Sequence, residues 1–354
     1  MENLNSKCSS CGYTLLFSPE KQALVCPQCG SVVLIKSGDA SDVKKDYNPN
    51  SKVERNLNVS SVFECSGCGA KTSINETNVI GTCPYCGSSN VHELANAIEF
   101  EPDAIVPFKI TKDAACEKYK HWIKTRKFVP NKLKSNAKIN KMEGYYLPTW
   151  SFDYNVNSTF KGVGVNEHSK TVHERGTDGN MYPVTKRYTT RHPFSGTRFD
   201  VFKNKVHTAT SQINQHELTK LGNFGLEKLK VYSPEYLLGF ASAGLNVDMH
   251  LGFENLKHET KQEVESLVKM QYRYDRYERF NLECMFNTIT WQFIYLPVWI
   301  CNFKYTKKEY RFLVNGHTGY VTGKVPRSPF KIGALVLGIL AVVGAVVALI
   351  AQNV

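Results

Sequence analysis

The chain has 354 residues, of which 42% are hydrophobic and 21% are charged. That balance excludes a largely disordered protein and leaves room for one domain of ordinary size with small modules at its ends. The formal net charge is +12, an excess that suits nucleic acid or an anionic membrane surface without choosing between them. The opening sequence MENLNSKCSS has no apolar run. We therefore expect no secretory signal and place this end of the chain in the reducing cytoplasm.

Four Cys-x-x-Cys pairs lie in the N-terminal part of the chain. Within each of two modules, 14 residues separate the pairs, and the modules match at an offset of 57 residues, including the glycine that follows each pair. In a chain without a secretory signal, this spacing predicts metal ligands rather than disulfides. The predicted ligands are Cys8, Cys11, Cys26 and Cys29 in the first module, and Cys65, Cys68, Cys83 and Cys86 in the second.

Four thiolates per module favour one tetrahedral zinc ion, with iron as the alternative that the same ligands allow. A closed set of four ligands leaves no position for a catalytic water, so both zinc ions are predicted to be structural. A module this small buries no core of its own, and the metal should supply about 10–16 kcal/mol of its folding free energy.

These observations predict two β-hairpin, rubredoxin-like zinc ribbons: ribbon 1 over residues 1–35 and ribbon 2 over residues 61–95. A polar stretch without apolar periodicity separates them and predicts a flexible linker over residues 36–60. Ribbon 2 adjoins the next domain in sequence and is the one expected to dock on it. Ribbon 1, beyond the linker, is expected to be the freer of the two.

Residues 98–327 have the apolar patterns of an α+β central domain with an antiparallel sheet. Helical spacing and strand alternation each occur in it, and an Asn-Gly turn signal lies between the last two predicted strands. Helices are predicted over 111–127 and 254–272, and strands over 150–156, 296–305, 309–314 and 319–325.

One short sequence occurs twice in this domain. Residues 146–150 are YLPTW and residues 295–299 are YLPVW. Each copy opens a predicted strand, where proline is tolerated at the first positions. The repetition therefore predicts a structural duplication inside the central domain.

Residues 332–351 form an uncharged stretch of 20 residues, twelve of them Ile, Leu or Val. At about 1.5 Å per residue, a helix of this length spans about 30 Å, the thickness of the bilayer hydrocarbon, so one transmembrane helix is predicted. Lys324, Arg327 and Lys331 precede it and no basic residue follows. The positive-inside rule then gives a single-pass protein of the cell membrane with its N-terminal bulk in the cytoplasm.

Small residues four apart in this helix, such as Gly344 and Ala348, suit helix pairing and a homo-oligomer. Catalytic signatures are missing from the sequence: it has no GxxxxGK[ST] loop, no HExxH and no GxSxG. His168, His173 and His192 lie in a polar stretch and are expected to be solvated loop residues. We therefore do not expect an enzyme.

The order of the motifs resembles bacterial membrane proteins with a TFIIB-type zinc ribbon, of the YdjG-like family. The resemblance is carried by the paired ribbons, by the YLPTW and YLPVW segments, by residues 312–319 (FLVNGHTG), and by the apolar stretch that follows them. It implies partners of the SPFH (flotillin-like) and PspA-like kinds in an envelope-stress response, which the ribbons and the anchor would bring to the membrane.

Two functions remain open from the sequence. The leading expectation is a membrane-anchored adaptor that recruits cytoplasmic proteins at the lipid bilayer. The alternative is a zinc-ribbon nucleic-acid-binding protein tethered to the membrane, which the net charge of +12 favours. Against it, ribbon 1 offers only Lys7 and Lys21 as cations and ribbon 2 only Lys71 between Cys65 and Cys86. That is sparse for a surface that grips phosphates.

Overall fold

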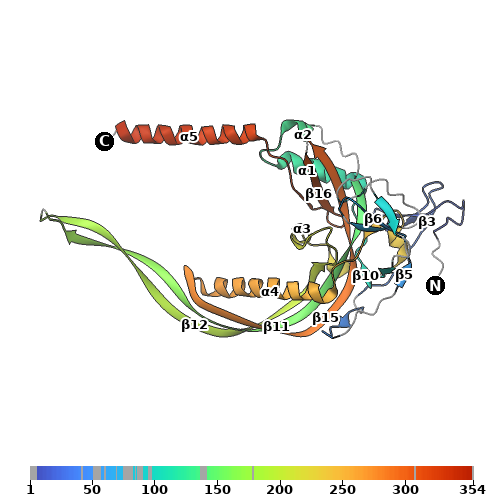
Figure 1. Ribbon diagram of the computed structural model, residues 1–354, viewed down its shortest axis with the longest axis horizontal. Coiled ribbons are helices and arrows are strands. Elements are labelled where there is room, and N and C mark those ends of the chain that lie inside the picture. Colours follow the sequence, from blue (N-terminus) through green and yellow to red (C-terminus); the bar gives the residue numbers. More distant parts are fainter. Residues whose placement is uncertain are drawn as a thin grey trace.

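The computed structural model describes residues 6–40, 43–50, 57–59, 61–68, 70–74, 83, 85, 91–94, 98–135, 142–177, 179–306 and 308–352. Figure 1 shows an open molecule with three parts: a sheet-rich body, a long curved arm formed by the far ends of β11, β12 and β15, and one isolated helix. The helix leaves the body in the same direction as the arm. The N-terminal modules lie on the side of the body away from both extensions.

Three long antiparallel strands build the body and the arm. β11 (Met142–Arg175) lies between β12 (Met181–Thr208) and β15 (Arg276–Tyr305). The expected antiparallel sheet is in fact mixed, because β10 runs parallel to β15 and β14 runs parallel to β11. The shorter strands of this sheet are β4 (Lys45–Asp46), β6 (Ser61–Cys65), β7 (Lys71–Ile74), β8 (Val91–Leu94), β10 (Ala104–Ile105), β13 (Lys230–Val231), β14 (Ala241–Ala243), β16 (Lys308–Asn315) and β17 (Val321–Gly323).

Both faces of the body sheet are buried. Along β11, Tyr145 and Leu147 belong to one hydrophobic core and Tyr146 to the other, as the two-residue period of a strand requires. The core that contains Tyr146 includes ribbon 1 side chains, and the core that contains Tyr145 and Leu147 includes ribbon 2 side chains. The two ribbons therefore pack on opposite faces of the same sheet.

Helices pack beside the sheet, and capping residues explain where α1, α3 and α4 begin. α1 (Lys112–Thr125) begins after Thr111, whose hydroxyl accepts the N–H of Ala114, so the predicted helix and its cap are confirmed. α4 (Met249–Tyr272) begins after Asp248, five residues before the predicted start. The remaining helices of the body are α2 (Asn131–Ser135) and α3 (Gln215–Lys220), with 3-10 turns η1 (Leu226–Lys228) and η2 (Pro234–Leu237).

The repeated YLPxW segments confirm the expected duplication. They are neighbouring antiparallel strands with Leu147 opposite Leu296. The indole Nε1 of Trp150 donates to the carbonyl of Val247 at 2.9 Å, and that of Trp299 donates to the carbonyl of Ile110 at 2.9 Å. Each acceptor directly precedes the N-cap of a helix, α4 for Trp150 and α1 for Trp299. The tryptophan of each repeated segment thus fixes the start of a helix that belongs to the other copy of the duplicated unit, through the same hydrogen bond.

Backbone hydrogen bonds repeat the same relation. Ala209, just after β12, donates to the carbonyl of Pro148, and Gly316, just after β16, donates to the carbonyl of Pro297. In each half a short strand, β14 or β10, then runs parallel to the YLPxW strand of the other half. The unit strand–helix–long hairpin therefore occurs twice, as β10–α1–β11–β12 and as β14–α4–β15–β16.

Residues 36–40 and 43–50 of the predicted linker (36–60) are packed against the central domain. β4 pairs with β15 opposite Thr290 and Trp291, and the ring of Tyr47 lies 4.7 Å from that of Phe253. The expectation of a flexible linker was wrong for this part. The sequence did not reveal this packing, because a two-residue strand and a single aromatic contact produce no periodic pattern of apolar residues. Residues 51–56 and 60 lie outside the described part of the chain.

α5 (Pro329–Gln352) stands apart from the body. It is long and apolar enough to cross a membrane, and none of its apolar window is buried against the protein. The chain is tied to the body where α5 begins, through hydrogen bonds from Ser328 N to the carbonyl of Phe128 and from Lys331 Nζ to the carbonyl of Val129.

Candidate metal centres

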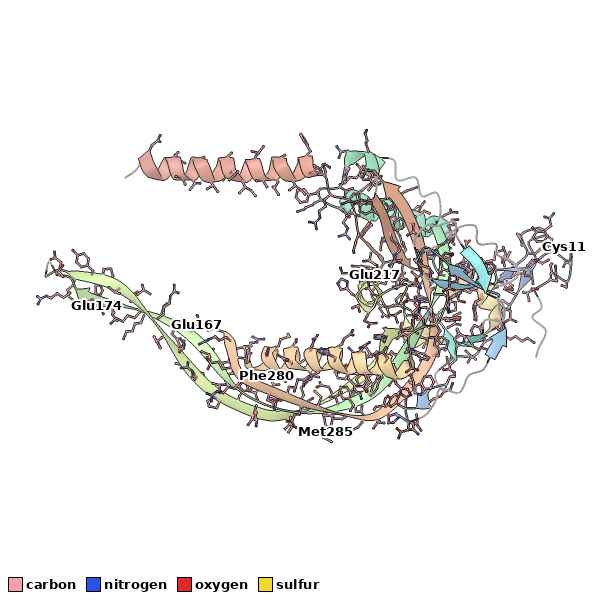
Figure 2. The ribbon with its side chains drawn as sticks, in the orientation of Figure 1. Cys11, Glu167, Glu174, Glu217, Phe280 and Met285 are labelled. Atoms are coloured by element: carbon pink, nitrogen blue, oxygen red, sulfur yellow. The ribbon has the colours of Figure 1, made fainter. Side chains whose placement is uncertain are left out.

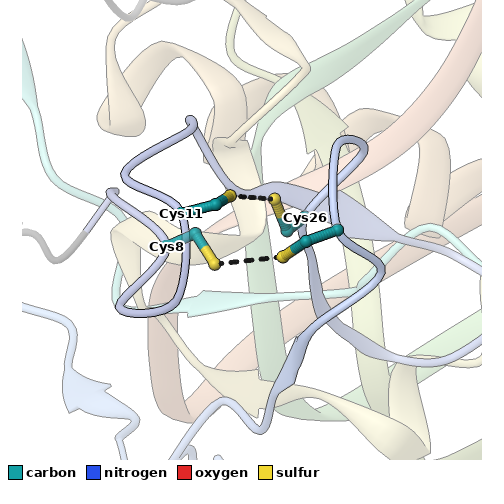
Figure 3. A group of neighbouring side chains, drawn as sticks. Cys8, Cys11 and Cys26 are labelled. Carbon is teal, nitrogen blue, oxygen red and sulfur yellow. Dashed lines mark hydrogen bonds between the residues drawn. The ribbon is translucent and has the colours of Figure 1, made fainter.

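Ribbon 1 is a three-stranded antiparallel sheet with a cysteine cluster at one end. The strands are β1 (Leu16–Ser18), β2 (Ala23–Val25) and β3 (Val32–Val33), with β2 in the middle. The predicted hairpin, with its turn after Ser18, is confirmed. Figure 3 shows the four thiols converging from two loops. Cys8 Sγ lies 3.5 Å from Cys29 Sγ, and Cys11 Sγ lies 3.4 Å from Cys26 Sγ.

Each loop is a tight turn closed by glycine. Gly12 donates its N–H to the carbonyl of Cys8, and Gly30 donates to that of Cys26, at 2.8 and 2.9 Å. Both glycines have left-handed backbones, with φ of 72° and 74°, a conformation in which a residue with a Cβ is strained. The turn brings the two sulfurs of a Cys-x-x-Cys pair to the same side.

The sulfur positions fit one tetrahedral metal ion. All four Sγ atoms lie within 4.8 Å of one another, and four ligands at about 2.3 Å from a central ion would be about 3.8 Å apart. Cys8 and Cys26 are buried while Cys11 and Cys29 are exposed. A metal ion here would sit at the edge of the module, near solvent.

The thiols of Cys8 and Cys11 differ in how readily they lose a proton. Backbone N–H groups of Ser10 and Cys11 lower the pKa of Cys8 to about 6. The backbone N–H of Tyr13 lowers the pKa of Cys11, but the hydrogen bond with Cys26 and desolvation outweigh it and raise that pKa to about 12. Four adjacent thiols cannot all lose a proton without a counter-charge. A divalent metal would supply that charge and displace the remaining protons.

Ribbon 2 repeats this arrangement in its described part. Cys65, Cys68 and Cys83 have their Sγ atoms within 4.8 Å of one another, with Cys68 and Cys83 3.7 Å apart. Cys65 N donates to the carbonyl of Ala70, as Cys8 N donates to that of Tyr13, at the offset of 57 residues. Cys86, the predicted fourth ligand, lies outside the described residues. These clusters of three and four cysteines could each hold a metal ion.

Ribbon 1 docks on the central domain through Phe17. Its ring makes an edge contact with Tyr236 at 5.2 Å, and its backbone N–H donates to the carbonyl of Leu238 at 2.9 Å. Gln22 Nε2 donates to the carbonyl of Phe108 at 2.7 Å. Ribbon 1, which was expected to be the freer module, is therefore also docked on the body, through a contact that the sequence pattern of the ribbon did not reveal.

Ribbon 2 docks by joining the main sheet. β7 pairs antiparallel with β14, and Gly244 N donates to the carbonyl of Lys71 at 2.7 Å. Tyr85 packs on Tyr145 with ring centroids 6.0 Å apart. The expected docking of this module is confirmed. β6 pairs with both β7 and β8 inside the module, while β5 (Leu57–Val59) and β9 (Ile98–Phe100), which flank it in sequence, pair with each other.

The remaining candidate residues form no further cluster of three metal-type ligands in the described parts of the chain. His168 and His173 lie on β11, and His192 lies on β12, not in a loop as expected. His168 and His192 each contact the hydroxyl of Thr190, at 3.0 and 3.1 Å. All three histidines lie on the part of β11 and β12 that forms the arm, where Figure 2 labels Glu167 and Glu174.

The comparisons with known proteins give one similarity. No family model matches the chain, and no solved structure matches it. The chain is similar to the uncharacterized protein YdjG of Bacillus subtilis (strain 168), with 24% identity over 337 residues that cover 95% of this chain and 94% of YdjG. The similarity extends over nearly the whole of both chains, which supports the YdjG-like resemblance.

Proposed function

We propose that the protein is a membrane-anchored adaptor with two structural zinc ions, whose ribbons and central domain recruit cytoplasmic proteins to the bilayer. The resemblance to YdjG-like proteins suggests partners of the SPFH and PspA-like kinds in an envelope-stress response. Zinc is the metal proposed because a set of four thiolates suits a tetrahedral ion with no redox role. Among the described residues, no cluster arranges a nucleophile, a base and a pocket as catalysis would require.

The observation that carries this proposal is an apolar surface on ribbon 1. Tyr13, Val32, Val33 and Leu34 are exposed, Leu34 to 77% of its surface. In the described part of the chain β3 pairs with β2 alone, which makes it an edge strand. An unpaired edge with apolar side chains is a surface that another protein can cover. It is poorly suited to the phosphates of nucleic acid, which require cations.

The position of this surface supports an adaptor. Cys11 of ribbon 1 lies at the side of the body away from α5 (Figure 2). With α5 in the bilayer, ribbon 1 would face the aqueous phase. The basic residues that precede α5 support a cytoplasmic location for that phase, by the positive-inside rule. Membrane residence and partner binding would then depend on separate parts of the chain.

The charged end of the arm limits the direction in which α5 can enter the bilayer. α5 and the arm extend in the same direction in Figure 1, but the end of the arm carries charged groups, including an ion pair between Lys186 and Glu174. Bilayer hydrocarbon around α5 would not accept them. We infer that α5 points away from the arm in the membrane and that it turns about its first turn, where Ser328 and Lys331 are bonded to the body.

The experiment is an affinity purification of the full chain in mild detergent from its native host, with the Cys26→Ser and Cys83→Ser double variant as comparison. We expect a protein partner with the native chain and its loss with the double variant, while both chains stay in the membrane fraction. Equal partner recovery from both chains would show that the ribbons do not recruit. Recovery of nucleic acid resistant to about 0.5 M salt would favour the alternative function.

A further inference from the structure

Two basic segments far apart in sequence meet where α5 leaves the body. Residues 118–134 and 324–331 together contain ten Lys or Arg and no Asp or Glu. Ser328 N bonds the carbonyl of Phe128 at 2.7 Å, and Lys331 Nζ bonds Asn131 Oδ1 at 2.7 Å. Figure 1 shows α1 and α2 beside the first turn of α5. We call this set the basic collar: Lys118, Lys120, Lys124, Arg126, Lys127, Lys132, Lys134, Lys324, Arg327 and Lys331.

The cations of α1 and of the residues directly after it are exposed. α1 buries Ala115, Tyr119 and Ile123 against the body, which leaves its lysines on the solvent side. Among the described residues, no carboxylate forms an ion pair with Lys118, Lys120, Lys124, Arg126 or Lys127. The cations of the arm differ, since Lys186, Arg191 and Arg198 each have an acidic partner.

A pocket of about 480 Å³ lies within the collar, between α1 and the turn that precedes β17. Lys118, His121 and Arg126 line it together with Trp122, Tyr320 and one acidic residue, Glu117. The guanidinium of Arg126 lies 4.5 Å from the centre of the Trp122 ring. Cationic groups beside aromatic rings are the composition of the membrane–water interface, where the cations meet phosphates and the rings meet the acyl boundary.

The first turn of α5 continues this surface. Phe330 is 85% exposed, and the apolar helix follows it directly. Ser328 is bonded to the body before the helix begins, so the start of α5 stays beside α1 and α2 whatever direction the helix takes. When α5 is inserted, the collar and its pocket therefore lie at the level of the lipid headgroups.

We infer that the basic collar binds anionic phospholipid headgroups of the leaflet that α5 enters, with the pocket of Lys118, His121 and Arg126 taking a headgroup phosphate. The inference rests on the proposed membrane anchor and adds a lipid specificity to it. Each basic residue held near an anionic surface strengthens the association by on the order of fivefold. The collar would select membranes or membrane regions that are rich in anionic lipid, and would orient the body on them.

The test uses the full chain in vesicles of equimolar phosphatidylglycerol and phosphatidylcholine. After solubilisation in a neutral detergent and washing on an affinity column, the retained lipids are quantified by mass spectrometry. We expect phosphatidylglycerol to be enriched at least about fivefold over phosphatidylcholine. In the triple variant Lys118→Gln, Lys124→Gln and Arg126→Gln, this enrichment should fall to below twofold (roughly, from the loss of three such contributions).

A matched control removes the same charge elsewhere. Lys161→Gln, Lys170→Gln and Arg187→Gln lie on the arm, and this variant should keep the native enrichment. Equal enrichment in the native chain and the collar variant, or equal loss in both variants, would overturn the inference. So would displacement of phosphatidylglycerol by 10 mM inorganic phosphate or by a micromolar single-stranded oligonucleotide, since the collar would then bind a free phosphate or nucleic acid.

Failure of this inference can be told apart from failure of the anchor. Extraction of the vesicles at alkaline pH reports whether α5 is inserted. A chain that is released was never anchored, which removes the proposed function. A chain that resists extraction but shows no lipid preference is anchored without a headgroup site, which removes only the basic collar as a lipid-binding surface.

Discussion

The two ribbons have the same cysteine spacing but are attached to the central domain in different ways. Ribbon 1 is held by one aromatic side chain, Phe17, and a few hydrogen bonds. Ribbon 2 is held by its backbone, because β7 extends the main sheet beside β14. Side-chain docking leaves the edge strand β3 exposed, whereas pairing of strands makes ribbon 2 part of the domain. The same metal module can thus present a binding surface in one position and complete a sheet in the other.

The largest effect should come from breaking the metal site of ribbon 2. Cys83→Ser removes a buried ligand and should unfold the module, which withdraws β7 from β14 and exposes the core around Tyr145. We expect the free energy of unfolding of the central domain to fall by about 3–5 kcal/mol, as for loss of a large core side chain. Chemical denaturation of the full chain in detergent, with zinc analysis falling from two ions to one, measures this. An unchanged midpoint would show that the domain does not need the strand.

Breaking the metal site of ribbon 1 should have a smaller effect on the domain. Cys26→Ser should also reduce the zinc content from two ions to one. The central sheet keeps all its strands, so we expect a loss of only about 1–3 kcal/mol, from the exposed surface around Tyr236 and Phe240. Denaturation under the same conditions gives the ranking. If Cys26→Ser is as destabilising as Cys83→Ser, the proposed difference in attachment is wrong.

Separating docking from metal binding sharpens the comparison. Phe17→Ala should leave both zinc ions in place, since the cysteine loops do not depend on that ring. It should release ribbon 1 from the body, because the edge contact with Tyr236 is lost. We expect hydrogen exchange over residues 13–25 to rise by at least tenfold, which corresponds to about 1.4 kcal/mol of lost protection. Leu16→Ala, a partly exposed neighbour on the same strand, serves as the control.

The clustering of the cysteines could be predicted from the sequence, while the attachment of the modules could not. Cys-x-x-Cys spacing is set by local backbone geometry, so Cys8, Cys11, Cys26 and Cys29 follow from a few neighbouring residues. The docking of Phe17 on Tyr236 joins residues more than two hundred positions apart, and an alternating strand pattern has no information about its partner. The same applies to β4, whose two residues pair with β15 without any pattern of their own.

The duplication shows what a short repeat can and cannot reveal. YLPTW and YLPVW indicated two equivalent strands, which the matching tryptophan contacts confirm. The sequence could not show that each tryptophan holds the helix of the other half, because Val247 and Ile110 contribute only a carbonyl. The basic collar was also missed in part: the cations before α5 were recognised, but those of α1 became their neighbours only through the contact of Ser328 with Phe128.

The smallest effect on the fold, and the most direct test of the adaptor, is expected at the exposed edge of ribbon 1. Leu34→Asp places a charge on a side chain that is 77% exposed, so the free energy of unfolding should change by less than about 0.5 kcal/mol and both zinc ions should remain. A partner that covers β3 would have to desolvate that charge, and its recovery from the full chain should fall by at least about tenfold. Leu251→Asp, on α4 and also largely exposed, should leave recovery unchanged. Unaltered recovery with Leu34→Asp, together with loss in Cys26→Ser, would move the recruiting surface to another part of ribbon 1. Unaltered recovery with both would assign it to the central domain, and the two ribbons would then differ only in how they are attached.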